Sequence, residues 1–266
     1  MSNISIVTAF FDIGRGNWTS DRGLPHYLQR SNETYLKRFS HLTNLDNEIV
    51  VFTSEDLVEK VKSYSKKEIK IVTLDFKEIA KALIANISLV QNNPEFQSKI
   101  NPMQVRNPEY WSPEYVAVNF LKSHFVNYAI SQNLVGNELV AWLDFGYCRS
   151  ESSLFGHKSW TYNFDLEKIH LFSIKDFTQG TYIRDIIYNN DVHITGPCIV
   201  ASKMKWSILT ILMNHSLNEL LINNLIDDDQ TLLLMSSLMN PEFFEIHKVS
   251  QSDWFTVFRD YNDNIS

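Results

Sequence analysis

Residues 4–17 read ISIVTAFFDIGRGN, an apolar run rich in β-branched residues that gives way to turn-forming residues at Asp12. Such a run is typical of a buried strand, and the turn residues predict that a loop opens at its carboxyl end. A helical pattern over residues 27–42 and a second apolar strand over 48–53 come next. The order strand, helix, strand predicts an α/β fold built on a parallel sheet.

The same alternation continues along the chain. A helix is expected from Ser54 to Tyr64, with Ser54 as its N-cap, followed by a third strand over residues 69–74. Further strand patterns cover residues 138–143, 167–172 and 192–195, and further helical patterns cover residues 116–130, 202–222 and 230–239. Between residues 91 and 113, prolines, asparagines and two adjacent aromatic residues predict a long ordered loop of the kind that forms a lid or a site wall.

Composition excludes several classes of protein. The chain has 266 residues, 44% of them hydrophobic, so it can bury a substantial core. A formal charge of −7 argues against a protein that follows nucleic-acid phosphates, although it leaves room for a local basic pocket. Two cysteines and the lack of a signal-peptide pattern indicate a reducing compartment, and no apolar run approaches the roughly 18 residues of a membrane span.

The strand pattern over 138–143 runs directly into Asp144-Phe145-Gly146. Ligands of open α/β sheets bind at the carboxyl ends of the strands. A carboxylate in that position can hold Mn²⁺ or Mg²⁺ against a diphosphate, but Asp144 can equally turn the chain at Gly146. Protein kinases also contain Asp-Phe-Gly, yet the glycine-rich and catalytic loops of a kinase are missing ahead of it.

A second acidic segment, Asp227-Asp228-Asp229-Gln230, lies between two helical patterns. The chemistry of the residues favours a structural role, in which Asp229 caps the helix that begins at Gln230. The functional alternative is a base that takes the proton of an acceptor hydroxyl.

Basic residues near the expected loops can neutralise a departing diphosphate, although solvation at the surface is the more common fate of each. The candidates are Arg15, Arg106, Lys122 and Arg149. His247 follows a strand-like segment and can serve as a metal ligand late in the sequence or as a structural residue.

Residues 6–15, IVTAFFDIGR, and residues 142–147, WLDFGY, together resemble the HtrL/YibB family of bacterial proteins. That family is associated with surface-polysaccharide genes and is similar to nucleotide-sugar glycosyltransferases of the GT-A type. The resemblance implies a GT-A-like α/β fold, with a mixed, mostly parallel central sheet flanked by helices. It also implies one domain over residues 1–266, with a nucleotide-binding part at about 1–150 and an acceptor-side part at about 151–266.

The resemblance also implies roles for individual residues. The donor would be bound by residues at the ends of the first and central strands and by the segment before the acidic cluster, namely Thr8, Phe10, Asp12, Arg15, Lys122, Trp142, Asp144, Gly146 and Gly196. Asp144 and His247 would hold Mn²⁺ or Mg²⁺, and Asp228 or Asp229 would be catalytic. Most GT-A enzymes have Asp-x-Asp at the metal site, whereas Gly146 stands here in place of the second carboxylate.

The resulting hypothesis is a metal-assisted glycosyltransferase that moves a sugar from a nucleotide-sugar donor, UDP-linked, to a surface glycan or glycolipid such as lipopolysaccharide or capsule. The resemblance places it in the cytoplasm or at the cytoplasmic face of the inner membrane, with peripheral contact at most. A non-catalytic protein that binds a nucleotide sugar or carbohydrate on the same fold is the alternative. A hydrolase with paired carboxylates is a third possibility, and it predicts glycan cleavage without a nucleotide.

Overall fold

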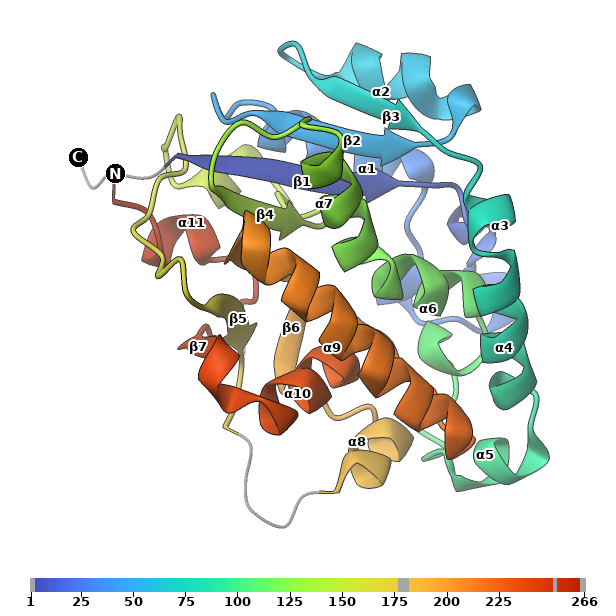
Figure 1. Cartoon of the computed structure of the whole chain (residues 1–266). Helices are drawn as coiled ribbons and strands as arrows, with labels where there is room; N and C mark the ends of the chain where they lie inside the picture. Colours follow the sequence, from blue (N-terminus) through green and yellow to red (C-terminus); the bar gives the residue numbers. More distant parts are fainter. Residues whose placement is uncertain (1–2, 177–181, 251–252, 264–266) are drawn as a thin grey trace.

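The computed structural model describes residues 3–176, 182–250 and 253–263. Its centre is a seven-stranded sheet with the order β3-β2-β1-β4-β6-β5-β7 (Figure 1). The strands are β1 Ile4–Phe10, β2 Ile49–Thr53, β3 Lys70–Thr73, β4 Leu139–Leu143, β5 Ile169–Ser173, β6 Ile194–Ser202 and β7 Phe244–Lys248.

The first four strands run parallel to one another, and the three later ones extend the sheet beyond β4. β1 pairs with β2 on one side and with β4 on the other, so the loops that follow β1 and β4 open at the same edge. β6 is antiparallel to both β4 and β5, while β5 and β7 are parallel. The expected mixed, mostly parallel central sheet is therefore confirmed.

Alternate residues of each strand face opposite sides of the sheet, and both sides are covered by helices. Val140 and Trp142 of β4 point to one hydrophobic core, whereas Leu139, Ala141 and Leu143 point to the other. Because both faces are buried, the strands read as continuous apolar runs and not as an alternation of polar and apolar residues.

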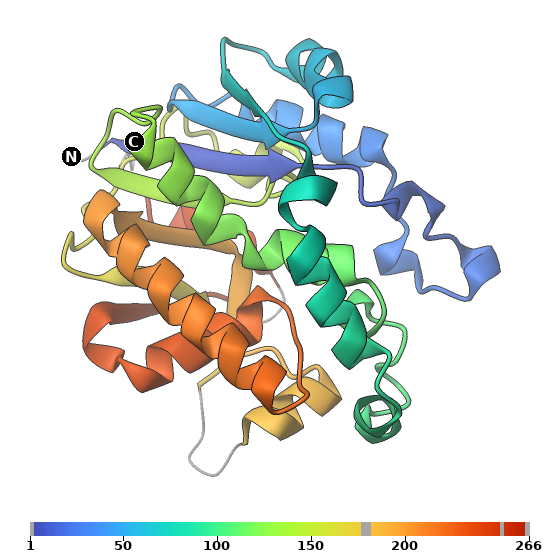
Figure 2. The ribbon, with the colours of Figure 1, turned by 45° about the vertical axis from the view of Figure 1, so that its right-hand side comes forward.

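The helices surround the sheet in two layers (Figures 1 and 2). Their bounds are α1 Asn32–Leu42, α2 Val58–Tyr64, α3 Phe76–Ile79, α4 Lys81–Gln91, α5 Pro94–Lys99, α6 Pro113–Phe120, α7 Lys122–Ser131, α8 Ile183–Asn189, α9 Lys203–Ile222, α10 Asp229–Met239 and α11 Val257–Asp260. Short 3₁₀ turns are η1 Arg15–Asn17, η2 Ser20–Arg22, η3 His26–Leu28, η4 Glu55–Leu57, η5 Pro108–Tyr110, η6 Glu151–Leu154 and η7 Pro241–Phe243. None of the described helices has both the length and the apolar character that crossing a membrane requires.

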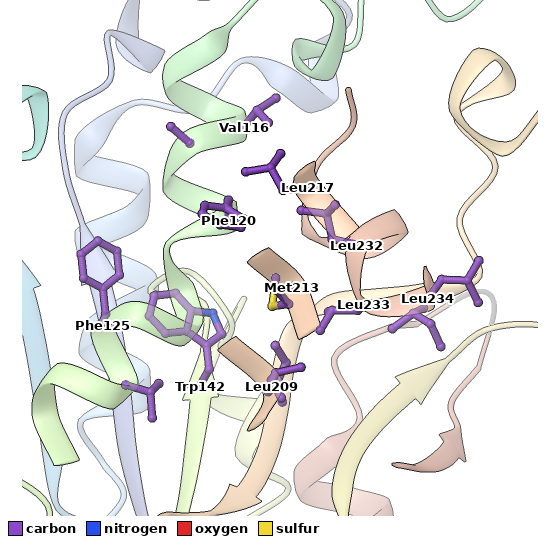
Figure 3. Close-up of a cluster of buried hydrophobic side chains, with 14 of the residues drawn as sticks. Val116, Phe120, Phe125, Trp142, Leu209, Met213, Leu217, Leu232, Leu233 and Leu234 are labelled. Atoms are coloured by element: carbon purple, nitrogen blue, oxygen red, sulfur yellow. The ribbon is translucent and has the colours of Figure 1, made fainter. Parts of the chain in front are cut away.

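The larger core lies between the sheet and the layer that contains α6, α7, α9 and α10. Side chains from these helices meet above the indole of Trp142 (Figure 3). Met213, Leu232 and Leu233 are fully buried there. This packing holds α7 against β4 and α10 against β6, near the polar residues described below.

Several expected elements differ from the structure in extent. The pattern over 116–130 is two helices, α6 and α7, because the chain breaks at Leu121. The expected strand over 192–195 is only the beginning of β6, which continues to Ser202. Residues 91–113 contain α5 and the turn η5 as well as loop. The division into a nucleotide-binding and an acceptor-side part stays a prediction.

Candidate functional site

A cavity of about 380 Å³ opens at the carboxyl ends of β1 and β4. We call it the cleft. Phe10 and the loop after β1 form one wall, and Asp144 to Gly146 form the end nearest β4. Residues 107–109, from the segment expected to be a lid or site wall, line it as well. Its position agrees with the rule that ligands bind at the carboxyl ends of strands in open α/β sheets.

Lys122, at the beginning of α7, lies at the bottom of the cleft with its side chain almost fully buried. Its Nζ donates hydrogen bonds to Oδ2 of Asp229 at 2.7 Å and to the carbonyl oxygen of Gly196 at 3.0 Å, and it pairs with Oδ1 of Asp144 at 3.0 Å. Burial by itself lowers the pKa of Lys122, but the two carboxylates outweigh it and raise that pKa above its ordinary value. The ammonium group therefore stays charged.

Asp144 follows β4 directly, as the sequence predicts, and its side chain is 40% exposed. Oδ1 accepts a hydrogen bond from Nε1 of Trp142 at 2.9 Å in addition to the ion pair with Lys122. Two strong donors thus hold one carboxylate oxygen in place.

Gly196 in β6 lies against the carboxylate of Asp229. A Cβ atom at this position would lie 2.4 Å from Oδ2 and 2.7 Å from Oδ1 of Asp229. Gly196 does not line the cleft, and its lack of a side chain lets Asp229 lie against β6 and reach Lys122.

The acidic segment at the start of α10 is buried. Asp228 is the N-cap, because its Oδ1 accepts a hydrogen bond from the backbone N–H of Gln230, so the cap expected at Asp229 lies one residue earlier. Oδ2 of Asp227 accepts from the hydroxyl of Thr231. Burial raises the pKa of all three carboxyl groups, that of Asp227 to about 7. Gln230 lines the cleft, whereas Asp228 and Asp229 do not.

The remaining residues expected to bind a donor fall into two sets. Phe10, Arg15, Trp142 and Gly146 line the cleft. Thr8 is buried within β1, and Asp12 does not line the cleft, because its carboxylate accepts from the backbone N–H of Gly14 and from Nδ2 of Asn32.

Three arginines line the cleft, Arg15, Arg30 and Arg149. Arg15 lies over the rings of Trp18 and Tyr35, with its Cζ 4.9 and 5.4 Å from the ring centroids. Only Arg15 and Arg149 were singled out from the sequence, because Arg30 precedes α1 without a neighbouring motif.

Glu109 was not predicted from the sequence to be a site residue. It lies in η5, lines the cleft, is 8% exposed, and its Oε2 has no hydrogen-bond partner. Burial, followed by the charge of Asp227, raises the pKa of Glu109 to about 8. A carboxyl group that titrates near neutral pH in a cleft is a candidate acid or base. Its one sequence signal is the position inside the proline-containing segment over 91–113.

The residues expected to hold Mn²⁺ or Mg²⁺ are not brought together. His247, in β7, does not line the cleft and lies instead beside His170 of β5, with Nε2 of His247 2.9 Å from Nδ1 of His170. In the described parts of the chain, the group of possible metal ligands that includes His247 consists of His170, Glu245 and His247. Asp144 follows β4 whereas His247 lies in β7, and β6 and β5 stand between these strands in the sheet, so Asp144 and His247 do not form a shared metal centre.

Comparison with known proteins supports the resemblance noted from the sequence. The family model HtrL_YibB, described as a bacterial protein of unknown function, matches residues 2–263. Protein HtrL of Escherichia coli strain K12 is 39% identical over 267 residues, which cover 99% of this chain and 94% of that protein. Among solved structures, the glycosyltransferase GlyE of Streptococcus pneumoniae TIGR4 is similar to 93% of this chain, with a TM-score of 0.38 and 12% identity. This chain covers 46% of the GlyE chain.

Proposed function

The chain belongs to the HtrL_YibB family, and from the geometry of its cleft we propose that it is a glycosyltransferase. It moves a sugar from a nucleotide-sugar donor, UDP-linked, to a bacterial surface glycan or glycolipid such as lipopolysaccharide or capsule. The observation that carries the proposal is a cleft at the ends of β1 and β4 that contains three arginines together with the buried carboxyl group of Glu109.

Sugar transfer needs both positively charged groups, such as these arginines, and a base, such as the carboxylate of Glu109. The bond between the anomeric carbon and the diphosphate oxygen breaks, and its electron pair leaves with the diphosphate. The acceptor oxygen forms a bond to the same carbon and loses its proton. Guanidinium groups stabilise the charge that develops on the diphosphate, and the carboxylate form of Glu109 accepts the proton.

The buried acidic segment has a positioning role in this proposal. Asp229 holds the ammonium group of Lys122 at the bottom of the cleft, and Asp228 fixes the beginning of α10. The expectation that Asp228 or Asp229 contacts the substrate stays untested, and Glu109 replaces them as the proposed base because it lines the cleft.

The test is a hydrolysis and transfer assay with a panel of UDP sugars, run in parallel with Mn²⁺, with Mg²⁺ and with EDTA, because the metal requirement is also a prediction. Glu109→Gln is expected to lower kcat at least about 100-fold, as the loss of a general base does, without abolishing donor binding. Glu219→Gln is the matched control, because Glu219 is exposed on α9. Equal kcat for wild type and Glu109→Gln would remove Glu109 from the mechanism.

A non-catalytic binding protein is the second candidate, and one observation favours it. Both carboxylates that the resemblance suggests as catalytic are buried and engaged, Asp229 with Lys122 and Asp228 as a helix cap. Binding of a UDP sugar by calorimetry, with no turnover for any donor and acceptor pair tested, would favour this candidate over the transferase.

A further inference from the structure

Four arginines, Arg15, Arg30, Arg38 and Arg149, gather at one side of the cleft. In the part of the chain that the structure describes, none of them forms an ion pair with a carboxylate. Arg15, Arg30 and Arg149 line the cleft itself. Like charges placed together without a counter-charge destabilise the free protein, and a bound anion removes that cost.

The pKa values of Arg149 and Arg38 are lowered, in part because the positive charges of the arginines lie close together. Burial, followed by the charges of Arg30 and Arg38, lowers the pKa of Arg149 to about 10. Burial, followed by the charge of Arg30, also lowers the pKa of Arg38. The charges of Tyr35 and Asp144 act in the opposite direction and raise the pKa of Arg149. In the described residues no carboxylate forms an ion pair with these arginines, so their positive charge is only partly offset within the cleft.

Hydrogen-bond donors in the same group have no partner. Nε of Arg15 and Nε of Arg149 are buried without one, as are Nη1 of Arg38 and the hydroxyl of Tyr35. Buried polar atoms in proteins almost always have a partner, so several unpartnered donors in one place indicate a ligand that carries acceptor oxygens. A diphosphate offers several such oxygens and negative charge together.

The aromatic residues around the group fix its geometry. Tyr115 lies under Arg15, with Cζ 5.5 Å from the ring centroid, and Phe255 lies under Arg149 at 4.1 Å. A Cβ atom at Gly146 would lie 2.9 Å from Cδ1 of Tyr35 and 3.6 Å from Cδ of Arg38. Gly146, which stands where most GT-A enzymes have the second carboxylate of Asp-x-Asp, therefore lets the chain after Asp144 pack against the arginine group.

Lys122 occupies the position in which a divalent cation would meet both acidic segments. Its ammonium group bridges Asp144 and Asp229, at 3.0 and 2.7 Å. A cation that binds Asp144 through Oδ1 would have to displace Lys122 and Trp142 from that oxygen.

We infer that the cleft binds the diphosphate of its donor through Arg15, Arg30 and Arg149, with Lys122 taking the place of a divalent cation, so that binding needs no metal ion. Arg38 supports the group from the side of α1. The inference deepens the proposed function, on which the choice of a sugar nucleotide as the carrier of the diphosphate rests.

Calorimetry with the full chain tests the inference, with inorganic pyrophosphate, UDP and uridine as probes, each in EDTA and each with Mn²⁺. Pyrophosphate and UDP are expected to bind in EDTA, with an affinity that falls as salt is added. Arg30→Gln and Arg149→Gln are each expected to weaken both ligands about 10-fold or more, as the loss of a charge-assisted hydrogen bond does, and to leave uridine unaffected. Arg184→Gln on α8, exposed and outside the cleft lining, is the matched control, and thermal unfolding of each variant checks its fold.

UDP binding that disappears in EDTA and returns with Mn²⁺ would overturn the inference, as would unchanged pyrophosphate affinity in both arginine variants. Failure of the proposed function can be distinguished from failure of this inference. Arginine-dependent pyrophosphate binding in EDTA without sugar transfer from any nucleotide sugar refutes the transferase and leaves the anion site. Sugar transfer that requires Mn²⁺ leaves the transferase and refutes the metal-free site.

Discussion

Lys122 connects two acidic segments that lie far apart in the sequence. In the described part of the chain its ammonium group is the one cation within ion-pair distance of Asp229, and Asp229 is fully buried. A buried carboxylate without a paired cation is strongly destabilising, because the low-dielectric interior solvates its charge far less than water does. The stability of the cleft floor therefore depends on this one side chain.

Replacing Lys122 by methionine keeps the length of the side chain and removes its charge. Lys122→Met is expected to lower the free energy of unfolding by about 3–5 kcal/mol, because Asp229 is left buried and unpaired. Urea unfolding measures the loss. Adding Asp229→Asn to this variant is expected to restore a large part of it, and Lys81→Met, in an exposed pair with Glu78, serves as the control. A loss in Lys122→Met no greater than in the control would contradict the assignment.

Glu109 gives a prediction for activity. Because the pKa of Glu109 lies near 8, the carboxylate form that accepts a proton is the minor form at pH 7. The value of kcat/KM is therefore expected to rise about tenfold per pH unit up to pH 8 and to level off above it. Steady-state kinetics from pH 6 to pH 9 check this, and Glu109→Gln should lose the rise. A profile that is flat from pH 6 to pH 9 in the wild type would speak against Glu109 as the base.

Elements could be predicted from the sequence where the apolar pattern is long and bounded by turns. β1, β2 and β4 lie within one or two residues of the expected strands, because each is buried on both faces and reads as a continuous apolar run. The residues of the cleft were harder to predict. Glu109 sits in a short turn without a motif, and Arg30 lies between elements, so only the folded chain shows that both face the cleft.

β6 was predicted too short for a physical reason. Thr195-Gly196-Pro197-Cys198 resembles a loop that faces the donor sugar in GT-A folds, and glycine and proline are rare within strands. In the structure this stretch continues a nine-residue strand. Asp229 approaches so closely that only glycine fits at position 196. The glycine that made this stretch look unlike a strand is therefore the residue that lets β6 pack against α10.

Gly196→Ala tests that junction. The added methyl group would lie 2.4 Å from Oδ2 of Asp229, so β6 and α10 are expected to separate and the bond between Asp229 and Lys122 to lengthen. The free energy of unfolding should fall by about 1–3 kcal/mol, as for overpacked cores, and pyrophosphate affinity should fall with it. Gly16→Ala, which meets nothing within 4 Å, is the control for urea unfolding and calorimetry. A Gly196→Ala protein as stable as the control would show that β6 and α10 adjust freely.

At the scale of the whole molecule, the fold keeps two buried acids protonated, Glu109 in the cleft and Asp227 just before α10. The pKa of Glu109 is raised from 4.5 to about 8 and that of Asp227 from 3.8 to about 7. Between the ordinary and the raised values the unfolded chain has lost these protons while the folded chain retains them. The contribution of these groups to stability is thus fully present below about pH 4 and is lost as the pH rises to about 8.

The difference between wild type and Glu109→Gln isolates one of these groups, because buried histidines such as His170 and His247 have lowered pKa values and change stability in the opposite direction below about pH 6.5. Glu109→Gln is expected to gain stability relative to wild type as the pH rises from 5 to 8, by up to about 1.4 kcal/mol per pH unit for the one proton involved. Urea unfolding at pH 5, 6, 7 and 8 measures the difference. A difference that is constant across these values would mean that Glu109 has the same pKa in the folded and unfolded chain, and that the cleft does not hold its proton.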